Sequence, residues 1–231
     1  MATHTRESLE RSGAVALHSG DRMDQAEFHR IYRAMPDGFE AELIGGTVFV
    51  ASPLKRRHAT GHLPLGTVFF LYASRTRGLE AGDNATVLLG EDSEPQPDLY
   101  LRVLPEFGGQ SRTTDDDYVA GPPELIGEIA HSSRAIDLHA KKDDYSRHGV
   151  LEYVVVCVHE QEVRWFDLKT NRMHPADAEG VYRSLVFPGL WIDSRALLTG
   201  DAQRIQATLE QGLASPDHAA FARELSASGP R

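Results

Sequence analysis

The sequence contains a single cysteine, Cys157, among its 231 residues. One thiol cannot form an intramolecular disulfide, and the lack of cysteine pairs argues against a zinc site built from thiolates. No apolar run approaches the roughly 18 residues of a membrane span, and the chain shows no hydrophobic segment typical of a signal peptide. These absences argue against a disulfide-rich secreted domain and a membrane protein, and they predict a cytoplasmic protein.

Positive charge is also scarce, because 24 lysines and arginines face 34 aspartates and glutamates, a formal net charge of −10. This balance disfavours a broad electrostatic contact with nucleic acid and leaves room only for local basic patches. The hydrophobic content of 41% suffices for one sizeable core. We expect one domain over residues 23–200, after a disordered extension (1–22) and before a polar helical or disordered tail (201–231).

The most informative stretch of the chain runs from residue 123 to residue 153. It opens with an apolar run, residues 125–130, bounded by glycine and proline, which predicts a buried strand. Glu128 interrupts this run, and strand alternation places it on the same side as Ile126 and Ala130. An ionised carboxylate among apolar neighbours needs a cation or hydrogen-bond donors, because burying it alone costs several kcal/mol or more.

A helix is predicted directly after this strand, over residues 134–148, with Gly149 as its C-cap and a second apolar strand at 153–158. Strand, helix and strand form a βαβ unit with parallel strands. Asp137, Lys141 and Tyr145 share one face of the helix at i, i+4 and i+8. From spacing alone, Asp137 and Lys141 are equally well a surface pair worth about 0.2–0.5 kcal/mol. The other interpretation is a site formed by the strand acid and the helix lysine.

Upstream, Asp24 can cap a helix that ends before residue 36, and residues 41–50 predict a hairpin with a glycine turn. Glu42 lies in the first strand of this hairpin, on the face opposite Leu43. By spacing alone, it is an exposed strand acid.

Asp98 follows Pro97 at the start of another predicted strand, and alternation puts it on one face with Tyr100, opposite Leu99. Taken by itself, an acid at a strand start more often serves a turn than catalysis. Further elements are expected as a helix at 55–77 that Pro64 and Gly66 kink or split, strands at 86–89, 162–168 and 182–187, a long polar loop at 104–120 and a short helix at 193–198.

Three consecutive cations, Lys55, Arg56 and Arg57, stand at the start of the helix expected at 55–77. The helix dipole disfavours cations there, whereas helix N-termini bind phosphates. We therefore consider this cluster, together with His58, as a contact for a nucleic-acid backbone; the alternative is a solvated basic cluster. His58 and His62 have an i, i+4 spacing that can bind a metal, but no glutamate accompanies them, so we treat the pair as coincidental.

Taken in order, the acids and the lysine form a Pro-Asp … Glu … Lys series. The series resembles the PD-(D/E)XK nuclease superfamily, the restriction-endonuclease-like fold, and more narrowly the Uma-type family of bacterial endonucleases. The resemblance covers about residues 23–200. The matching pieces are Glu42-Leu43-Ile44-x-Gly46, His58, Pro97-Asp98, Glu128-Ile129, Asp137-x3-Lys141-x3-Tyr145-x3-Gly149-Val150 and Glu152-Tyr153.

The resemblance implies an α/β (α+β) fold, a mixed β-sheet flanked by helices with an N-terminal helix and hairpin. It also implies that Asp98 and Glu128 bind Mg²⁺ or Mn²⁺, with Glu42 completing the metal site. Carboxylates that hold such hard cations neutralise charge on phosphoryl oxygens and activate water. The usual motif has a lysine two residues after the strand acid, where this chain has Ala130. The resemblance therefore assigns the role of assisting the attacking water to Lys141 on the helix, and the catalytic set to Asp98, Glu128, Lys141 and Glu42.

The chain departs from the family pattern at His131-Ser132-Ser133, where Ser-Pro-Ser is usual, and at Val154 and Cys157 in the second strand. Two hypotheses remain. The first is a Mg²⁺-dependent endonuclease acting on DNA. The second is a catalytically lapsed member that serves as a nucleic-acid or protein binding or assembly module. By analogy of fold we expect a homodimer, because cutting both strands favours two sites.

Overall fold

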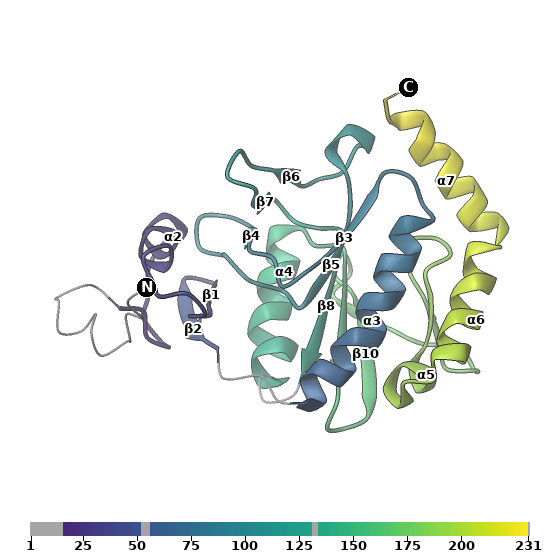
Figure 1. The fold of residues 1–231 in the computed structure, drawn as a ribbon, viewed down its shortest axis with the longest axis horizontal. Helices are drawn as coiled ribbons and strands as arrows, with labels where there is room; N and C mark the ends of the chain where they lie inside the picture. Colours follow the sequence, from purple (N-terminus) through teal and green to yellow (C-terminus); the bar gives the residue numbers. More distant parts are fainter. Residues whose placement is uncertain (1–15, 52–55, 131–133, 231) are drawn as a thin grey trace.

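The computed structural model describes residues 16–51, 56–130 and 134–230. Its centre is a six-stranded sheet in the order β11-β10-β9-β8-β5-β3, in which β8 and β9 are parallel and the other neighbours antiparallel. Helices cover both faces of the sheet (Figure 1), as expected for the mixed class. Its strands are β3 (Leu79–Asp83), β5 (Leu99–Val103), β8 (Leu125–Ala130), β9 (Glu152–Cys157), β10 (Glu162–Asp167) and β11 (Arg172–His174).

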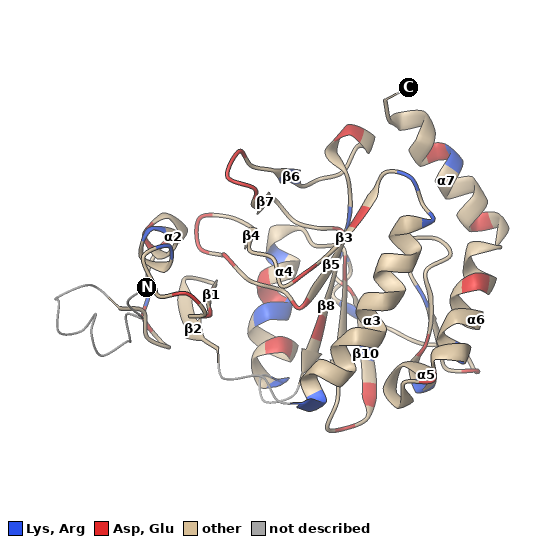
Figure 2. Ribbon diagram, viewed as in Figure 1, with Lys and Arg blue, Asp and Glu red and all other residues tan. Residues whose placement is uncertain are grey.

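Helix α3 (Arg56–Ser74) packs on one face of the sheet and continues through Pro64 and Gly66, where a kink or break was expected. Two glycines of α3 allow the helix to approach the sheet closely. A Cβ at Gly66 would lie 3.2 Å from Leu99, and one at Gly61 would lie 3.1 Å from Ile129. After two arginines at its start, α3 carries no charged Lys, Arg, Asp or Glu (Figure 2).

The opposite face of the sheet is covered by the helix of the predicted βαβ unit, which joins β8 to the parallel strand β9. The helix lies within the predicted range and ends at Gly149, whose φ of +92° is left-handed, as a C-cap requires. It is not regular, however. A π-helical segment, η2 (Ile136–Lys141), precedes the α-helical part, α4 (Lys142–His148). Such segments are frequent at functional sites, and the regular spacing of the sequence did not predict this one.

The N-terminal helix and hairpin form a small core of their own beside the sheet. Asp24 caps the helix by accepting from the backbone N–H of Glu27, as predicted. The expectation of disorder up to residue 22 is wrong for residues 16–22. Leu17 is buried in this core, and backbone hydrogen bonds join Gly20 and Asp21 to Val48. The elements are α2 (Gln25–Tyr32), β1 (Ala41–Ile44) and β2 (Thr47–Val50).

Several short elements were not predicted. Strand β3 lies at the edge of the sheet, and two of its five residues are charged, so it shows no clear apolar alternation. The polar loop expected at 104–120 contains strands of two residues, which exist only through their pairing with one another. The elements within this loop are η1 (Pro105–Phe107), β6 (Arg112–Thr113) and β7 (Val119–Ala120). Strand β4 (Val87–Leu88), which pairs with β7, lies within the strand predicted at 86–89.

The C-terminal segment is helical and packed rather than solvated along its length. Leu209 is buried, α6 packs against α3, and the ring of His218 shares a 2.9 Å hydrogen bond with the Thr76 hydroxyl. Among the described residues, no helix has the length and apolar character needed to cross a bilayer. The remaining elements are β12 (Val181–Arg183), β13 (Trp191–Asp193), α5 (Ser194–Thr199), α6 (Ala202–Leu213) and α7 (Pro216–Ser228).

Candidate active site

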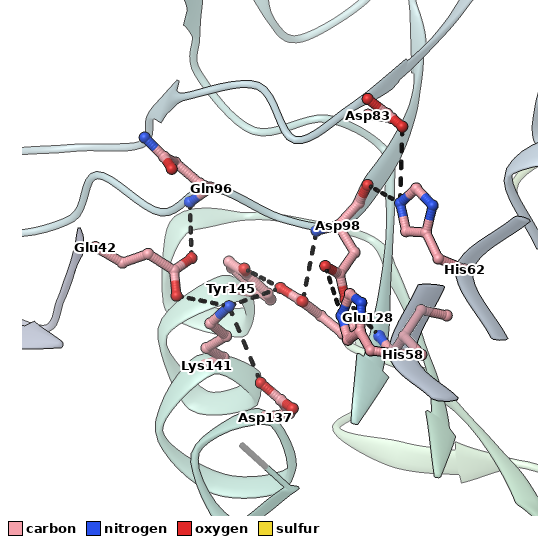
Figure 3. Close-up of polar contacts among 11 residues, drawn as sticks. Glu42, His58, His62, Asp83, Gln96, Asp98, Glu128, Asp137, Lys141 and Tyr145 are labelled. Carbon is pink, nitrogen blue, oxygen red and sulfur yellow. Dashed lines mark hydrogen bonds and ion pairs between the residues drawn. The ribbon is translucent and has the colours of Figure 1, made fainter. Parts of the chain in front are cut away.

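Asp98 and Glu128 lie side by side on the face of the sheet that the βαβ helix covers (Figure 3). Strands β5 and β8 pair with Leu99 opposite Gly127, so the next pair along the ladder is Asp98 and Glu128. The backbone N–H of Asp98 lies 3.5 Å from Oε2 of Glu128. The sequence placed both carboxylates on faces that could coincide, and the structure brings them together.

The carboxylate of Asp98 is held from two directions. Its Oδ2 accepts a 2.6 Å hydrogen bond from the N–H of Ile129, and Nε2 of His58 lies 3.1 Å from Oδ1. Burial opposes ionisation of Asp98, but the hydrogen bond and charge of His58 and the Ile129 N–H together lower its pKa. The hydrogen bond to Asp98 in turn raises the pKa of His58. The pair therefore favours the carboxylate and the imidazolium.

Lys141 reaches the same place from the C-terminal end of η2. Its Nζ lies 2.8 Å from Oε2 of Glu42, 3.0 Å from Oε1 of Glu128 and 4.0 Å from Oδ1 of Asp137. Burial disfavours a charged ammonium group, yet the pKa of Lys141 is raised because the surrounding carboxylates outweigh burial. The interpretation of Lys141 as half of a surface pair with Asp137 is therefore wrong.

Glu42 is not the exposed acid that strand spacing alone indicated. Its Oε1 accepts a 2.7 Å hydrogen bond from the backbone N–H of Gln96, and its Oε2 faces the ammonium group of Lys141. The position of β1 beside the βαβ helix is a tertiary feature, and only the family resemblance indicated it.

Negative charge exceeds positive charge at this point of the molecule. Four carboxylates, those of Glu42, Asp98, Glu128 and Asp137, surround the one ammonium group of Lys141 and the imidazole of His58. Burial raises the pKa of Glu128, and the charges of Asp98, Asp137 and Glu42 raise it further against the opposing effect of Lys141. Hard oxygen donors with surplus negative charge suit Mg²⁺ or Mn²⁺, so the donor set fits the expected metal.

Tyr145 also contacts the site, although sequence reasoning did not include it among the site residues. Its hydroxyl donates a 2.9 Å hydrogen bond to Oε1 of Glu128. The sequence contained an indication of this contact, because Tyr145 follows Lys141 by one helical turn on the same face. What the spacing does not reveal is that both residues reach the same carboxylate oxygen.

The basic cluster divides in the structure. His58, expected to contact nucleic acid, instead turns inward to Asp98 and is buried, while Arg56 and Arg57 are exposed at the start of α3. Lys55 and the unusual residues 131–133 lie outside the described residues. His62 accompanies His58, but its Nε2 lies 2.9 Å from the backbone oxygen of Asp98, so the two rings do not form a metal clamp.

A second group of acids and histidine lies elsewhere. Within the described ranges, Asp92, Asp144 and His148 are close enough together to hold a metal ion. Arg147 forms ion pairs with both Asp92 and Asp144, and the Ser93 hydroxyl donates to Asp144. The two carboxylates therefore share one guanidinium group, which offsets part of their charge.

Comparisons with known proteins identify the family and the fold. Residues 25–199 match the Uma2 family, described as "Putative restriction endonuclease". The fold is similar to that of a crystal structure of a "putative nuclease belonging to DUF820" from Anabaena variabilis ATCC 29413, with a TM-score of 0.57 and 14% identity. That similarity covers 74% of this chain and 96% of the other. No curated protein matches the chain.

The fold expected from the resemblance is thus confirmed. This chain belongs to the Uma2 family of proteins described as putative restriction endonucleases.

Proposed function

We propose that this protein is a metal-dependent endonuclease that hydrolyses phosphodiester bonds in DNA. The observation that carries the proposal is the surplus of buried carboxylates around Lys141, on a fold shared with a protein described as a "putative nuclease". Family membership supports nuclease chemistry; the metal, the substrate and the role of the lysine are our assignments.

Asp98 and Glu128 are the proposed metal ligands, with Glu42 as a third acid. A bound Mg²⁺ or Mn²⁺ supplies charge neutralisation at the phosphoryl group and a lowered pKa of water. The protein's own residues set the geometry: the Ile129 N–H and His58 hold Asp98, and Lys141 places a positive charge beside Glu128. From there the ammonium group can orient the attacking water and stabilise the charge that develops on the phosphate.

DNA contact is assigned to the exposed Arg56 and Arg57 at the start of α3, with Lys55 from the sequence alone. Phosphates favour helix N-termini and exposed arginines, so this short basic patch suits a backbone contact on an otherwise acidic protein. We further propose a cytoplasmic homodimer, since two sites suit cleavage of both strands.

The test is a Mn²⁺ titration by calorimetry with a plasmid-cleavage assay, on the native protein, Asp98→Ala and Asp92→Ala. The native protein and Asp92→Ala should bind Mn²⁺ and cut DNA. Asp98→Ala should lose most of its Mn²⁺ binding and most of its cleavage. Loss of binding in Asp92→Ala alone would place the metal at the Asp92, Asp144 and His148 cluster instead.

A second function is favoured by the acidic balance of −10 and by the unusual residues 131–133. A lapsed member of the family would bind DNA or another protein without cutting. Retarded migration of DNA by the native protein with no cleavage in Mg²⁺ or Mn²⁺ would establish this alternative.

A further inference from the structure

The two oxygens of the Glu128 carboxylate have unequal surroundings. Oε1 accepts from Nζ of Lys141 at 3.0 Å and from the hydroxyl of Tyr145 at 2.9 Å. Among the residues that the structure describes, Oε2 receives only the long 3.5 Å contact from the backbone N–H of Asp98. One oxygen is thus occupied by donors, and the other is turned toward Asp98 (Figure 3).

The two side chains that donate to Oε1 differ in how freely they can move. The ammonium group of Lys141 is shared with Glu42 and stands at the end of a flexible four-carbon chain. The hydroxyl of Tyr145 is fixed by a fully buried ring that packs edge-on against Tyr153, with centroids 5.2 Å apart. A phenol also donates one hydrogen bond in a defined direction, whereas an ammonium group has three donors. Tyr145 is therefore the donor that can hold Glu128 when Lys141 turns toward water or substrate.

We infer that Tyr145 is a positioning residue that fixes the rotation of the Glu128 carboxylate, so that Oε2 stays beside Asp98 for a shared cation. The inference rests on the proposed metal-dependent function. In metal sites, groups that orient a ligand without touching the metal typically contribute about 10–100-fold to affinity or activity. Tyr145 acts through Glu128 and does not itself contact substrate.

The neighbouring tyrosine provides a matched control. Tyr153 is equally buried, and its hydroxyl donates to the backbone oxygen of Asp137 at 3.0 Å rather than to a carboxylate. Tyr145→Phe and Tyr153→Phe each remove one buried hydroxyl from the same pair of rings, and each should lower stability to a similar extent. Only Tyr145→Phe removes a donor to Glu128.

The experiment measures Mn²⁺ affinity by calorimetry and the metal-free crystal structure of both variants. Tyr145→Phe should weaken Mn²⁺ binding about 10-fold or more, and its Glu128 carboxylate should rotate away from Asp98. Tyr153→Phe should stay within about twofold of the native affinity. Cleavage by Tyr145→Phe should recover at saturating Mn²⁺, because the defect lies in holding the ligand.

Three results would overturn the inference: unchanged Mn²⁺ affinity in Tyr145→Phe, equal losses in both variants, or an unmoved Glu128 carboxylate in the Tyr145→Phe crystal. If the first occurs while the native protein binds Mn²⁺ and cuts DNA, the proposed function stands without this role for Tyr145. Absence of Mn²⁺ binding by the native protein would instead refute the metal function, and the crystal structures would still decide whether Tyr145 orients Glu128.

Discussion

Three buried glutamates in or beside the βαβ unit differ in the groups that donate hydrogen bonds to their carboxylates. Glu124 precedes β8, and its carboxylate accepts from the backbone N–H groups of Val103 and Gln110 at 2.8 and 3.1 Å. Glu152 in β9 accepts from two further backbone N–H groups, the Trp165 indole and the Ser184 hydroxyl. Glu128, between them in sequence, accepts from the side chains of Lys141 and Tyr145.

The difference separates acids that hold the fold from an acid available for chemistry. Backbone donors cannot leave without unfolding a loop, so Glu124 and Glu152 fix the segments around 103–110 and 184–187. Glu128 is instead held by side chains, and under the proposed function Lys141 turns from it toward the substrate while its second oxygen binds the cation. Burial alone does not distinguish these roles, because it raises the pKa of all three carboxyl groups.

The largest effect is expected from Lys141→Ala, which removes the movable donor. Cleavage should slow by about 10²-fold or more, the scale of one charge-stabilising or acid–base group. Because the change leaves buried carboxylates uncompensated, unfolding is measured at the same Mn²⁺ concentration as cleavage. Loss of stability without loss of cleavage would show that Lys141 only stabilises the fold, as the donors to Glu152 do. The distinction between Glu128 and the other two glutamates would then fail.

Lys142 is the matched control for this measurement. Its Nζ donates to Asn171 at 2.6 Å and lies over the ring of Phe166, away from Glu128. Lys142→Ala should therefore leave cleavage nearly unchanged. Equal losses at both lysines would indicate general attraction of phosphate, and loss at Lys142 alone would assign the role to the wrong lysine.

Glu152→Ala should produce the next largest effect, on stability instead of cleavage. The change leaves the Trp165 indole, two backbone N–H groups and the Ser184 hydroxyl without their acceptor, and each unsatisfied buried donor costs about 1–3 kcal/mol unless water enters. Because water entering the vacated space replaces the acceptor for some of these donors, we expect a loss of about 2–3 kcal/mol in urea unfolding, with unchanged Mn²⁺ affinity. Glu162→Ala, which removes a part-exposed acid paired with Arg164, should cost under about 1 kcal/mol. A fall in Mn²⁺ affinity in Glu152→Ala would contradict the division of roles.

Strand alternation and helical spacing predicted those features of the site that lie within a single strand or a single helix. Alternation put Glu128 with Ile126 and Asp98 with Tyr100, and these faces are the same face of the sheet. Helical spacing aligned Lys141 with Tyr145, and both reach Glu128. The register between β5 and β8 is a tertiary property that no local pattern contained.

The same rules failed where the deciding partner is distant in sequence. Glu42 meets Lys141 across 99 positions, and Glu152 meets the segment near Ser184, so no strand pattern could tell either acid from an exposed one. We predicted His58 to belong to the basic cluster because its partner, Asp98, follows it by 40 residues and no local pattern joins the two. Strand β3 was missed because an edge strand needs no apolar alternation.

The smallest expected effect is in the pH dependence of stability, and it tests the backbone-held acids directly. Burial, opposed by the donors, raises the pKa of Glu152 above its ordinary value of 4.5. As pH rises from that value through the raised pKa, the unfolded chain has already lost this proton and the folded protein has not, so the carboxyl contribution to stability falls. Glu152→Gln keeps the size and cannot ionise. Its unfolding free energy in urea should therefore fall less steeply with pH than that of the native protein just above pH 4.5, by at most about 1.4 kcal/mol per pH unit. Glu124→Gln should show the same sign, since burial raises the pKa of Glu124 as well. Parallel pH curves for the native protein and both variants would mean that these two carboxyl groups titrate as they do in the unfolded chain, and the backbone donors would then hold them without a net cost of burial.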